Sequence, residues 1–175
     1  MTAENLVADP GSVDEIASAI KDLRVDPVVL LEASLRRIAA VETEVHGWCL
    51  LDRDNALAQA QVLRQEAQAG RLRSALHGIP IAIKDVLDVA GLPTRAGSKT
   101  RANIAPSTID AHVVTQLRVA GAIILGKAHT TEFAYFDGPP PTRNPHNTAH
   151  TPGGSSAGPA ALVAAGMVPL SLGTQ

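Results

Sequence analysis

The sequence is poor in cysteine and in aromatic residues. Its 175 residues include one cysteine, Cys49, and only two phenylalanines, one tryptophan and one tyrosine. A single cysteine excludes an intrachain disulfide and any zinc site built on several cysteines. Because aromatic side chains are scarce, a buried core has to be packed mainly from Ala, Val, Leu and Ile.

Positive charge is also in short supply, and long apolar runs are missing. Lys and Arg number 15 against 17 Asp and Glu, so the formal net charge is −2. Such a chain has no basic field for a nucleic-acid backbone or an anionic membrane surface. No apolar run approaches the roughly 20 residues of a membrane span, and the residues after Met1 lack the basic start of a signal peptide. We therefore expect a cytoplasmic protein with neither nucleic acid nor membrane as a direct partner.

The composition that remains is that of a folded globular domain. Hydrophobic residues make up 45% of the chain and charged residues 18%, whereas a disordered chain has the opposite balance. A chain of this length is long enough for one domain with a sizeable core and too short for two comfortable ones.

The N-terminal part of the chain predicts two helices that form a hairpin. Ser12 and Glu15 make a capping box in front of the first helix. Asp26 is the predicted cap of the second helix, with Pro27 at its first position, and this helix continues to about residue 42. The apolar residues at helical spacing are Ile16, Ile20 and Leu23 in the first helix, and Val29, Leu30, Ala33, Leu35, Ile38 and Val41 in the second.

The rest of the chain alternates short apolar runs with helical patterns, an order typical of α/β proteins. Strands are predicted at residues 48–51, 79–83, 122–125 and 168–172, and helices at residues 54–70, 110–121 and 156–165. Asp110 is the predicted N-cap of the middle one of these helices. We expect loops at residues 91–106 and 137–152, and the five prolines of the second favour a functional loop.

A glycine-rich segment near the C-terminus is the first candidate site. Residues 151–158 read Thr-Pro-Gly-Gly-Ser-Ser-Ala-Gly, with Gly153 and Gly154 directly before Ser155 and Ser156. Glycine frees the backbone from the Cβ clash, so that a serine hydroxyl and nearby N–H groups can face a ligand. A tight turn that leads into a helix explains the same segment equally well.

Lys84 is the second candidate, because it ends the apolar run Ile81-Ala82-Ile83. A lysine in this position either extends to water or is partly desolvated, and desolvation lowers its pKa. A neutral lysine is a usable general base. Asp85 follows directly, and for the lysine considered alone an ion pair at the rim of the sheet is the commoner arrangement.

Two further patterns do not support a site. Residues 121–127 match the P-loop pattern except at its last position, where Ala128 replaces the Ser or Thr that binds magnesium, and the intervening residues favour a strand. The six histidines lack the spacing of a zinc site, and we expect neither a metal nor a cofactor. His46 is close to Cys49 in the sequence, but nothing nearby would lower a thiol pKa. We expect surface histidines and a buried thiol.

Lys84 and Ser155 together indicate more than either residue alone, because a lysine can activate a serine hydroxyl without histidine. The segments around these two residues closely resemble the amidase signature family. Further resemblance lies in residues 117–127, 132–134, 144–147 and 164–174, so that it covers nearly the whole chain.

The resemblance implies an α/β fold with a large mixed sheet covered by helices, preceded here by the N-terminal helical hairpin. Members hydrolyse carboxamides through a Ser-Ser-Lys triad and an acyl-enzyme. By resemblance, Lys84 is the general base and Ser155 is the bridging serine, whose preceding peptide bond is cis in the family. Gly153, Gly154 and Ser156 form the supporting loop. The implied partner is a small-molecule amide, and a homodimer of the full-length protein is compatible with an exposed helical hairpin.

The sequence departs from the family pattern at its end. The nucleophilic serine of the family lies in a glycine-rich stretch after Leu-Gly-Thr, whereas this chain ends at Gln175, directly after that tripeptide. We therefore expect residues 1–175 to be the N-terminal portion of a single amidase domain, inactive by itself.

Two alternatives to a free-standing amidase stay open. The first is the amide-hydrolysing component of a tRNA-dependent amidotransferase, which looks similar in these motifs and requires partner subunits. The second is a non-catalytic remnant that binds a ligand or partner through the glycine- and serine-rich segment.

Overall fold

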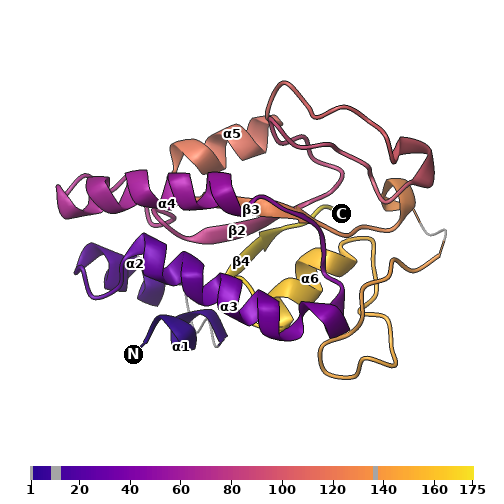
Figure 1. Ribbon diagram of the computed structural model, residues 1–175, viewed down its shortest axis with the longest axis horizontal. Helices are drawn as coiled ribbons and strands as arrows, with labels where there is room; N and C mark the ends of the chain where they lie inside the picture. Colours follow the sequence, from indigo (N-terminus) through magenta and orange to yellow (C-terminus); the bar gives the residue numbers. More distant parts are fainter. Residues whose placement is uncertain (1, 9–12, 136–137) are drawn as a thin grey trace.

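The computed structural model describes residues 2–8, 13–135 and 138–175 (Figure 1). Its centre is a mixed sheet of four strands, in the order β1-β3-β2-β4. The strands are β1 (Trp48–Leu51), β2 (Pro80–Lys84), β3 (Ile123–Ala128) and β4 (Leu170–Leu172). β2 is parallel to both of its neighbours, and β1 is antiparallel to β3. This mixed α/β architecture confirms the predicted fold class.

The two central strands are buried on both faces, which explains why they are continuous apolar runs rather than alternating ones. Helices α3 (Pro27–Val45), α4 (Arg53–Gln68) and α6 (Ala157–Ala164) pack on one face, and α5 (His112–Val119) lies on the other (Figure 1). Leu31, Ile38 and Leu162 are fully buried in the first of these layers. Each such side chain contributes about 1.5–3 kcal/mol by leaving water.

Both predicted N-terminal helices are present, as α2 (Val13–Lys21) and α3, and they share one cluster of buried apolar residues. Asp26 is the N-cap of α3, and its side chain accepts a hydrogen bond of 2.7 Å from the backbone N–H of Val28. Ser12 lies outside the described residues. Two of the apolar residues noted at helical spacing are exposed: Leu23, beyond the end of α2, at 60%, and Val29 at 42%.

One helix and two short turns were not predicted. The helix is α1 (Ala3–Ala8), whose apolar residues pack against α3. The 3₁₀ turns are η1 (Lys99–Arg101), within the predicted loop 91–106, and η2 (Glu132–Ala134). Residues 138–152 contain no helix or strand, in agreement with the predicted loop, and Asp137 lies outside the described residues.

Two polar residues take other roles than those predicted. Asp110 does not cap α5, because its carboxylate accepts a hydrogen bond from the N–H of Ala90 and pairs with Arg118 instead. His77 was expected at the surface but is buried, with ring Nε2 2.9 Å from the carbonyl oxygen of Leu63. Both corrections have one physical reason: a partner outside the local pattern, Ala90 at 20 positions from Asp110 and Leu63 at 14 positions from His77, is supplied by the tertiary fold.

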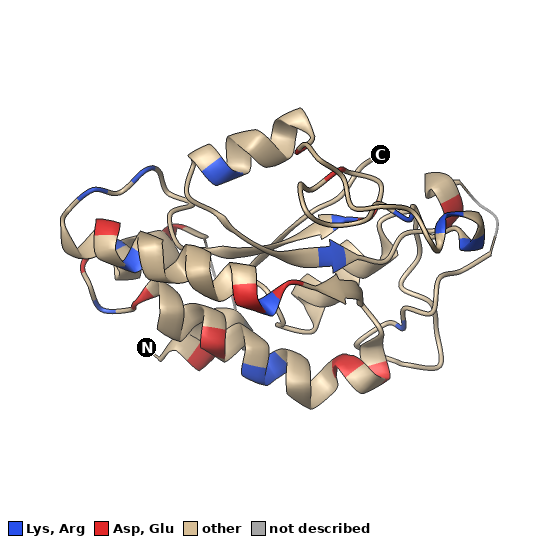
Figure 2. Ribbon diagram, turned by 45° about the horizontal axis from the view of Figure 1, so that its top comes forward, with Lys and Arg blue, Asp and Glu red and all other residues tan. Residues whose placement is uncertain are grey.

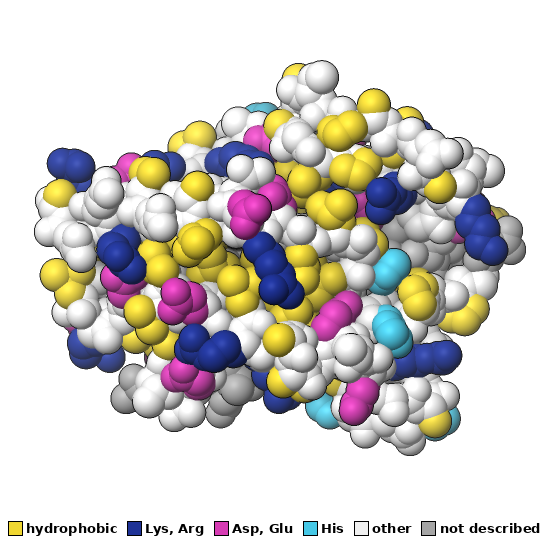
Figure 3. All heavy atoms as spheres, viewed as in Figure 1, with side chains coloured by type: hydrophobic (Ala, Val, Ile, Leu, Met, Phe, Trp, Pro, Cys, Tyr) yellow, Lys and Arg dark blue, Asp and Glu magenta, His cyan; other side chains and the backbone are white. Residues whose placement is uncertain are grey.

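The surface carries charges of both signs. Figure 3 shows acidic and basic side chains interspersed on the face that includes α3 and α4. Figure 2 shows, in addition, basic residues within the sheet itself. Among the described helices, none combines the length and the apolar character needed to cross a membrane.

Candidate active site

Lys84 is the last residue of β2, and its side chain is fully buried. Its Nζ donates hydrogen bonds of 2.7 Å to Oγ of Ser155 and of 2.7 Å to Oγ1 of Thr174. Asp85, the next residue, is not its partner, because that carboxylate pairs with Lys127. The structure therefore brings Lys84 and Ser155 together and excludes the rim ion pair with Asp85.

The sheet topology explains this meeting. β2 and β4 are parallel neighbours, so their carboxyl ends lie at the same edge of the sheet. Lys84 ends β2, Thr174 follows β4 by two residues, and Ser155 stands two residues before α6, which packs against both strands. The backbone N–H of Thr131 donates to the carbonyl oxygen of Ser155 at 3.2 Å and holds this loop to the segment after β3.

The backbone conformation and the close packing of the loop explain why glycines precede Ser155. The Gly154–Ser155 peptide bond is cis. Gly153 has φ +91°, a value that other residues rarely adopt. A Cβ on Gly154 would lie 2.9 Å from the side chain of Thr131, so a larger residue would push the loop away from that neighbour.

Ser156 takes a role that differs from its position. It stands at the N-cap of α6, where serine is common, but its side chain makes no capping hydrogen bond. Its hydroxyl instead donates to the carbonyl oxygen of Thr174 at 2.9 Å and accepts from the N–H of the same residue at 3.1 Å. Ser156 thereby holds Thr174, which in turn contacts Lys84.

Burial governs the electrostatics of this site. It lowers the pKa of Lys84 below the ordinary lysine value, because the charged amine loses water and gains no carboxylate. A neutral amine accepts a proton from a hydroxyl across the same short contact with Ser155. The arrangement is thus chemically able to remove a proton from a serine.

Cys49 and His46 do not form a second site. Cys49 is half-buried, whereas a buried thiol was predicted. Its Sγ donates to the carbonyl oxygen of Lys127 at 3.2 Å, and burial raises the pKa of the thiol to about 12. A thiol with this pKa is a poor nucleophile at neutral pH. His46 is exposed at the C-cap of α3.

Two residues of the region were missed in the sequence. Thr174 carries a hydroxyl in the Leu-Gly-Thr tripeptide of the family pattern, and this hydroxyl could have indicated a site residue. Lys127 is fully buried in β3; its signal was that it continues an apolar run, as Lys84 does. The P-loop pattern that ends at Lys127 lies largely in this buried strand, which confirms that it forms no phosphate cradle.

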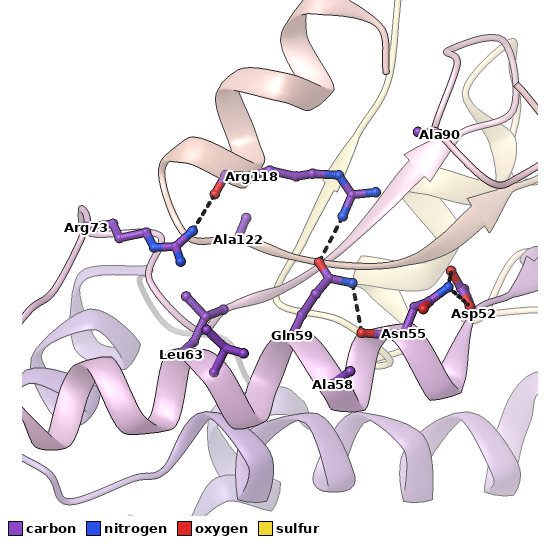
Figure 4. Close-up of a pocket in the computed structure, with 10 residues that line it drawn as sticks. Asp52, Asn55, Ala58, Gln59, Leu63, Arg73, Ala90, Arg118 and Ala122 are labelled. Carbon is purple, nitrogen blue, oxygen red and sulfur yellow. Dashed lines mark hydrogen bonds between the residues drawn. The ribbon is translucent and has the colours of Figure 1, made fainter. Parts of the chain in front are cut away.

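Neither Lys84 nor Ser155 lines either of two surface cavities, although Asp85, which follows Lys84, lines one of them. A cavity of about 530 Å³ lies between α4 and α5 (Figure 4). Gln59 is at its centre, and its Oε1 accepts from Arg118, while the Asn55 side chain bonds to Asp52. The other cavity, of about 660 Å³, is lined by Asp85, Arg95 and the prolines of the loop after η2, among others. Among the described residues, no group of three or more His, Cys, Asp or Glu is placed to hold a metal ion.

The fold and the site together define a class: an α/β protein in which a buried lysine at a sheet edge is hydrogen-bonded to a serine on a glycine-rich loop. More particularly, the chain belongs to the amidase family, because the family model "Amidase" matches residues 29–175.

Curated relatives and solved structures agree with this assignment. A glutamyl-tRNA(Gln) amidotransferase subunit from Acidothermus cellulolyticus is 41% identical over 165 residues, which cover 91% of this chain and 32% of that protein. The native peptide amidase of Stenotrophomonas maltophilia is 35% identical with a TM-score of 0.84, over 91% of this chain and 35% of that one. An amidase family protein of Bacillus anthracis is 31% identical with a TM-score of 0.87, over 98% and 36%. The chain thus spans about a third of the length of the relatives it matches.

Proposed function

We propose that this chain is the N-terminal part of an enzyme domain that hydrolyses carboxamide C–N bonds through a serine acyl-enzyme. Lys84 is the general base and Ser155 is the bridging serine in this proposal. The observation that carries it is the 2.7 Å contact between Lys84 Nζ and Ser155 Oγ, in a buried site where the described residues offer the lysine no carboxylate partner.

The proposed proton path uses the contact between Lys84 and Ser155. The nucleophilic serine, which lies beyond residue 175 in this proposal, gives its proton to Ser155 as it attacks the amide carbonyl, and Ser155 passes a proton to neutral Lys84. When the C–N bond breaks, the proton returns from Lys84 through Ser155 to the departing amine. Water then hydrolyses the acyl-enzyme by the same relay, with proton transfer again balanced by Lys84.

Gly153, Gly154 and Ser156 give the relay its shape. The two glycines permit the backbone that presents Ser155 to Lys84. Ser156 holds both backbone groups of Thr174, whose hydroxyl is the second acceptor for Lys84 Nζ. Two fixed acceptors orient the amine, and orientation of a catalytic group is a large part of its effect.

The test compares two proteins. One is the 175-residue chain, and the other continues to the length of the relatives. We expect the longer protein to be labelled by a serine-directed fluorophosphonate and to release ammonia from simple primary amides, and the 175-residue chain to do neither. Robust labelling of the shorter chain would show that the nucleophile lies within it and would contradict the proposed relay.

A second candidate within the same chemistry is a component of an amidotransferase. The observation that favours it is the 41% identity to the glutamyl-tRNA(Gln) amidotransferase subunit from Acidothermus cellulolyticus. Such a component is expected to hydrolyse amides poorly alone and to gain activity when mixed with its partner subunits, whereas a free-standing amidase shows its full rate as a purified single chain. If the longer protein has no activity in either assay, the non-catalytic alternative gains support.

We include a cytoplasmic location and a small-molecule amide as substrate in the proposal. The single cysteine needs no oxidising compartment.

A further inference from the structure

Two of the four lysines in the chain are fully buried, and they stand at the ends of neighbouring strands. Lys84 is the last residue of β2, and Lys127 lies in β3. In the register of these two parallel strands, Lys84 stands opposite Ala128 and Lys127 stands opposite Ile83. Successive residues of a strand point to opposite faces, and paired residues of adjacent strands share a face. The two lysine side chains therefore leave the sheet on opposite faces. Basic residues are visible in both strands in Figure 2.

The partners of the two lysines differ in charge. Lys127 Nζ lies 2.7 Å from Oδ1 of Asp85, and the two side chains are 0% and 3% exposed. The same amine donates to Oγ1 of Thr94 at 3.0 Å, and the other oxygen of Asp85 accepts from the N–H of Arg95 at 3.2 Å. Within the described part of the chain, the side-chain partners of Lys84 are hydroxyls alone.

This difference matters because Asp85 directly follows Lys84. Cα atoms of consecutive residues are about 3.8 Å apart, and a buried carboxylate so near would favour the protonated form of Lys84. A lysine held in that form is no base. The site therefore needs the charge of Asp85 to be cancelled.

We propose that Lys127 is a positioning residue for Lys84: it binds Asp85 on the opposite face of the sheet and shields Lys84 from that carboxylate. Lys127 does not touch the serine relay. The inference rests on the proposed function only in treating Lys84 as the base.

Few other charges face Lys84. β4, α6, residues 151–156 and residues 173–175 carry no ionisable side chain. The ionisable groups on the remaining segments near Lys84 are those of Asp85, Asp88, Arg95, Lys127, His129 and Glu132, the α-carboxylate of Gln175, and on α3 those of Glu32, Arg36, Arg37, Glu42 and Glu44. Burial lowers the pKa of His129, and Glu132 accepts a hydrogen bond from Ser98. The charged side chains of α3 are exposed, with the exception of Glu42. The carboxylate of Glu42 is half-buried and accepts hydrogen bonds from backbone N–H groups. Asp85 and Lys127 are thus the buried charged side chains beside Lys84, and the α-carboxylate of Gln175 is the same in all variants.

The test measures the titration of Lys84 directly. In the 175-residue chain labelled at lysine, the Cε and Nζ resonances of each lysine are followed by NMR from about pH 6 to pH 11. The variants are Lys127→Met, which removes the shielding charge and keeps the length of the side chain, and Lys127→Met with Asp85→Asn, which removes both charges. Lys21, an exposed lysine of α2, is the internal control and should have one midpoint in all variants.

We expect Lys127→Met to raise the titration midpoint of Lys84 by about half to one pH unit, because Asp85 is then uncompensated. The double variant should return the midpoint to within about 0.2 unit of the wild-type value. A purely structural role of Lys127 would instead move both variants in the same way. An unchanged midpoint in Lys127→Met, or equal shifts in both variants, would overturn the proposal.

Lys127→Met leaves a buried carboxylate without its partner and is the variant most prone to unfold. Should it not fold, the wild type and the uncharged double variant still decide the question. Shielding predicts equal midpoints of Lys84, and a fall of more than about half a unit in the double variant would show that Asp85 acts on Lys84 despite Lys127. Since this readout needs no amide hydrolysis, failure of the proposed function and failure of the shielding are separate results.

Discussion

The amine of Lys84 lies 2.7 Å from the hydroxyl of Ser155, although the two residues are 71 positions apart in the chain. The contact joins the end of a buried strand to the loop before α6. Burial disfavours the charged form of the amine, because the charge loses its contact with water. The two hydroxyls do not restore the charge compensation that a carboxylate would give.

Replacement of Lys84 removes the base. In the longer protein, we expect Lys84→Met to lower kcat/KM for amide hydrolysis by about a thousand-fold or more, since the methionine keeps the length of the side chain but accepts no proton. The matched control is Lys21→Met on the exposed face of α2, which should retain the wild-type rate. Near-normal hydrolysis by Lys84→Met would reject the assignment of the base.

Replacement of Ser155 breaks the relay at its middle. Ser155→Ala should cost about as much as Lys84→Met, and the double variant should be little slower than either single one, because residues that act as a unit are not additive. Steady-state rates of the three variants, with the exposed Ser18→Ala as control, make this comparison. Independent, multiplying losses would indicate that the two residues act in separate steps.

The pH dependence of the rate follows from the burial of Lys84. The base works as the neutral amine, and burial lowers the pKa of Lys84 below its ordinary value. The rate constant kcat/KM should therefore rise with pH through this lowered pKa and level off at a pH where an exposed lysine is still protonated. A pH–rate profile measures the midpoint. A profile that keeps rising up to the ordinary pKa of lysine, about 10.4, would contradict a desolvated base.

Cys49 should react slowly in the folded protein. Burial raises the pKa of its thiol to about 12, so only about one thiol in ten thousand is ionised at pH 8. Alkylation by iodoacetamide, followed by mass spectrometry, should be about a thousand-fold slower in the native protein than in guanidinium chloride. Equal rates in the two states would show that the thiol is freely accessible and normally acidic.

The stability of the fold should decrease in acid in part through His129. Burial lowers the pKa of this histidine in the folded state, so the unfolded chain binds the proton first as the pH falls. Its contribution to stability is fully present above the unfolded pKa of about 6.5 and is lost as the pH falls through the folded pKa. Urea denaturation across this range should show a steeper loss of the free energy of unfolding in the wild type than in His129→Gln. Parallel curves would contradict the burial of a neutral imidazole.

Much of the fold was predictable because its signals are local. Asp26-Pro27 begins α3, the run Trp48–Leu51 is β1, and the α/β alternation follows from spacing that neighbouring residues set by themselves. The predictions failed where the decisive partner is remote. Asp110 accepts a hydrogen bond from the N–H of Ala90, 20 positions away, instead of capping α5, and His77 is buried against Leu63 of α4, 14 positions away.

The candidate site, too, was predictable in part from local sequence and in part only from the tertiary structure. Lys84 and Ser155 were singled out by residue type and by resemblance, and their catalytic roles stay predictions. Lys127 was considered only as the end of the rejected P-loop pattern, because its partner Asp85 follows β2 and is 42 positions away in the chain.

The sequence by itself determined which segments become strands and helices, and which residues have the chemistry to form a lysine–serine pair. Only the tertiary structure decided the partners of each charge. Parallel pairing of β2 with β3 and β4 brings Lys84 to the hydroxyls of Ser155 and Thr174 and turns Lys127 toward Asp85. The physical reason is that periodicity is a property of adjacent residues, whereas the desolvation and pairing of a buried charge depend on atoms that the fold brings from far along the chain.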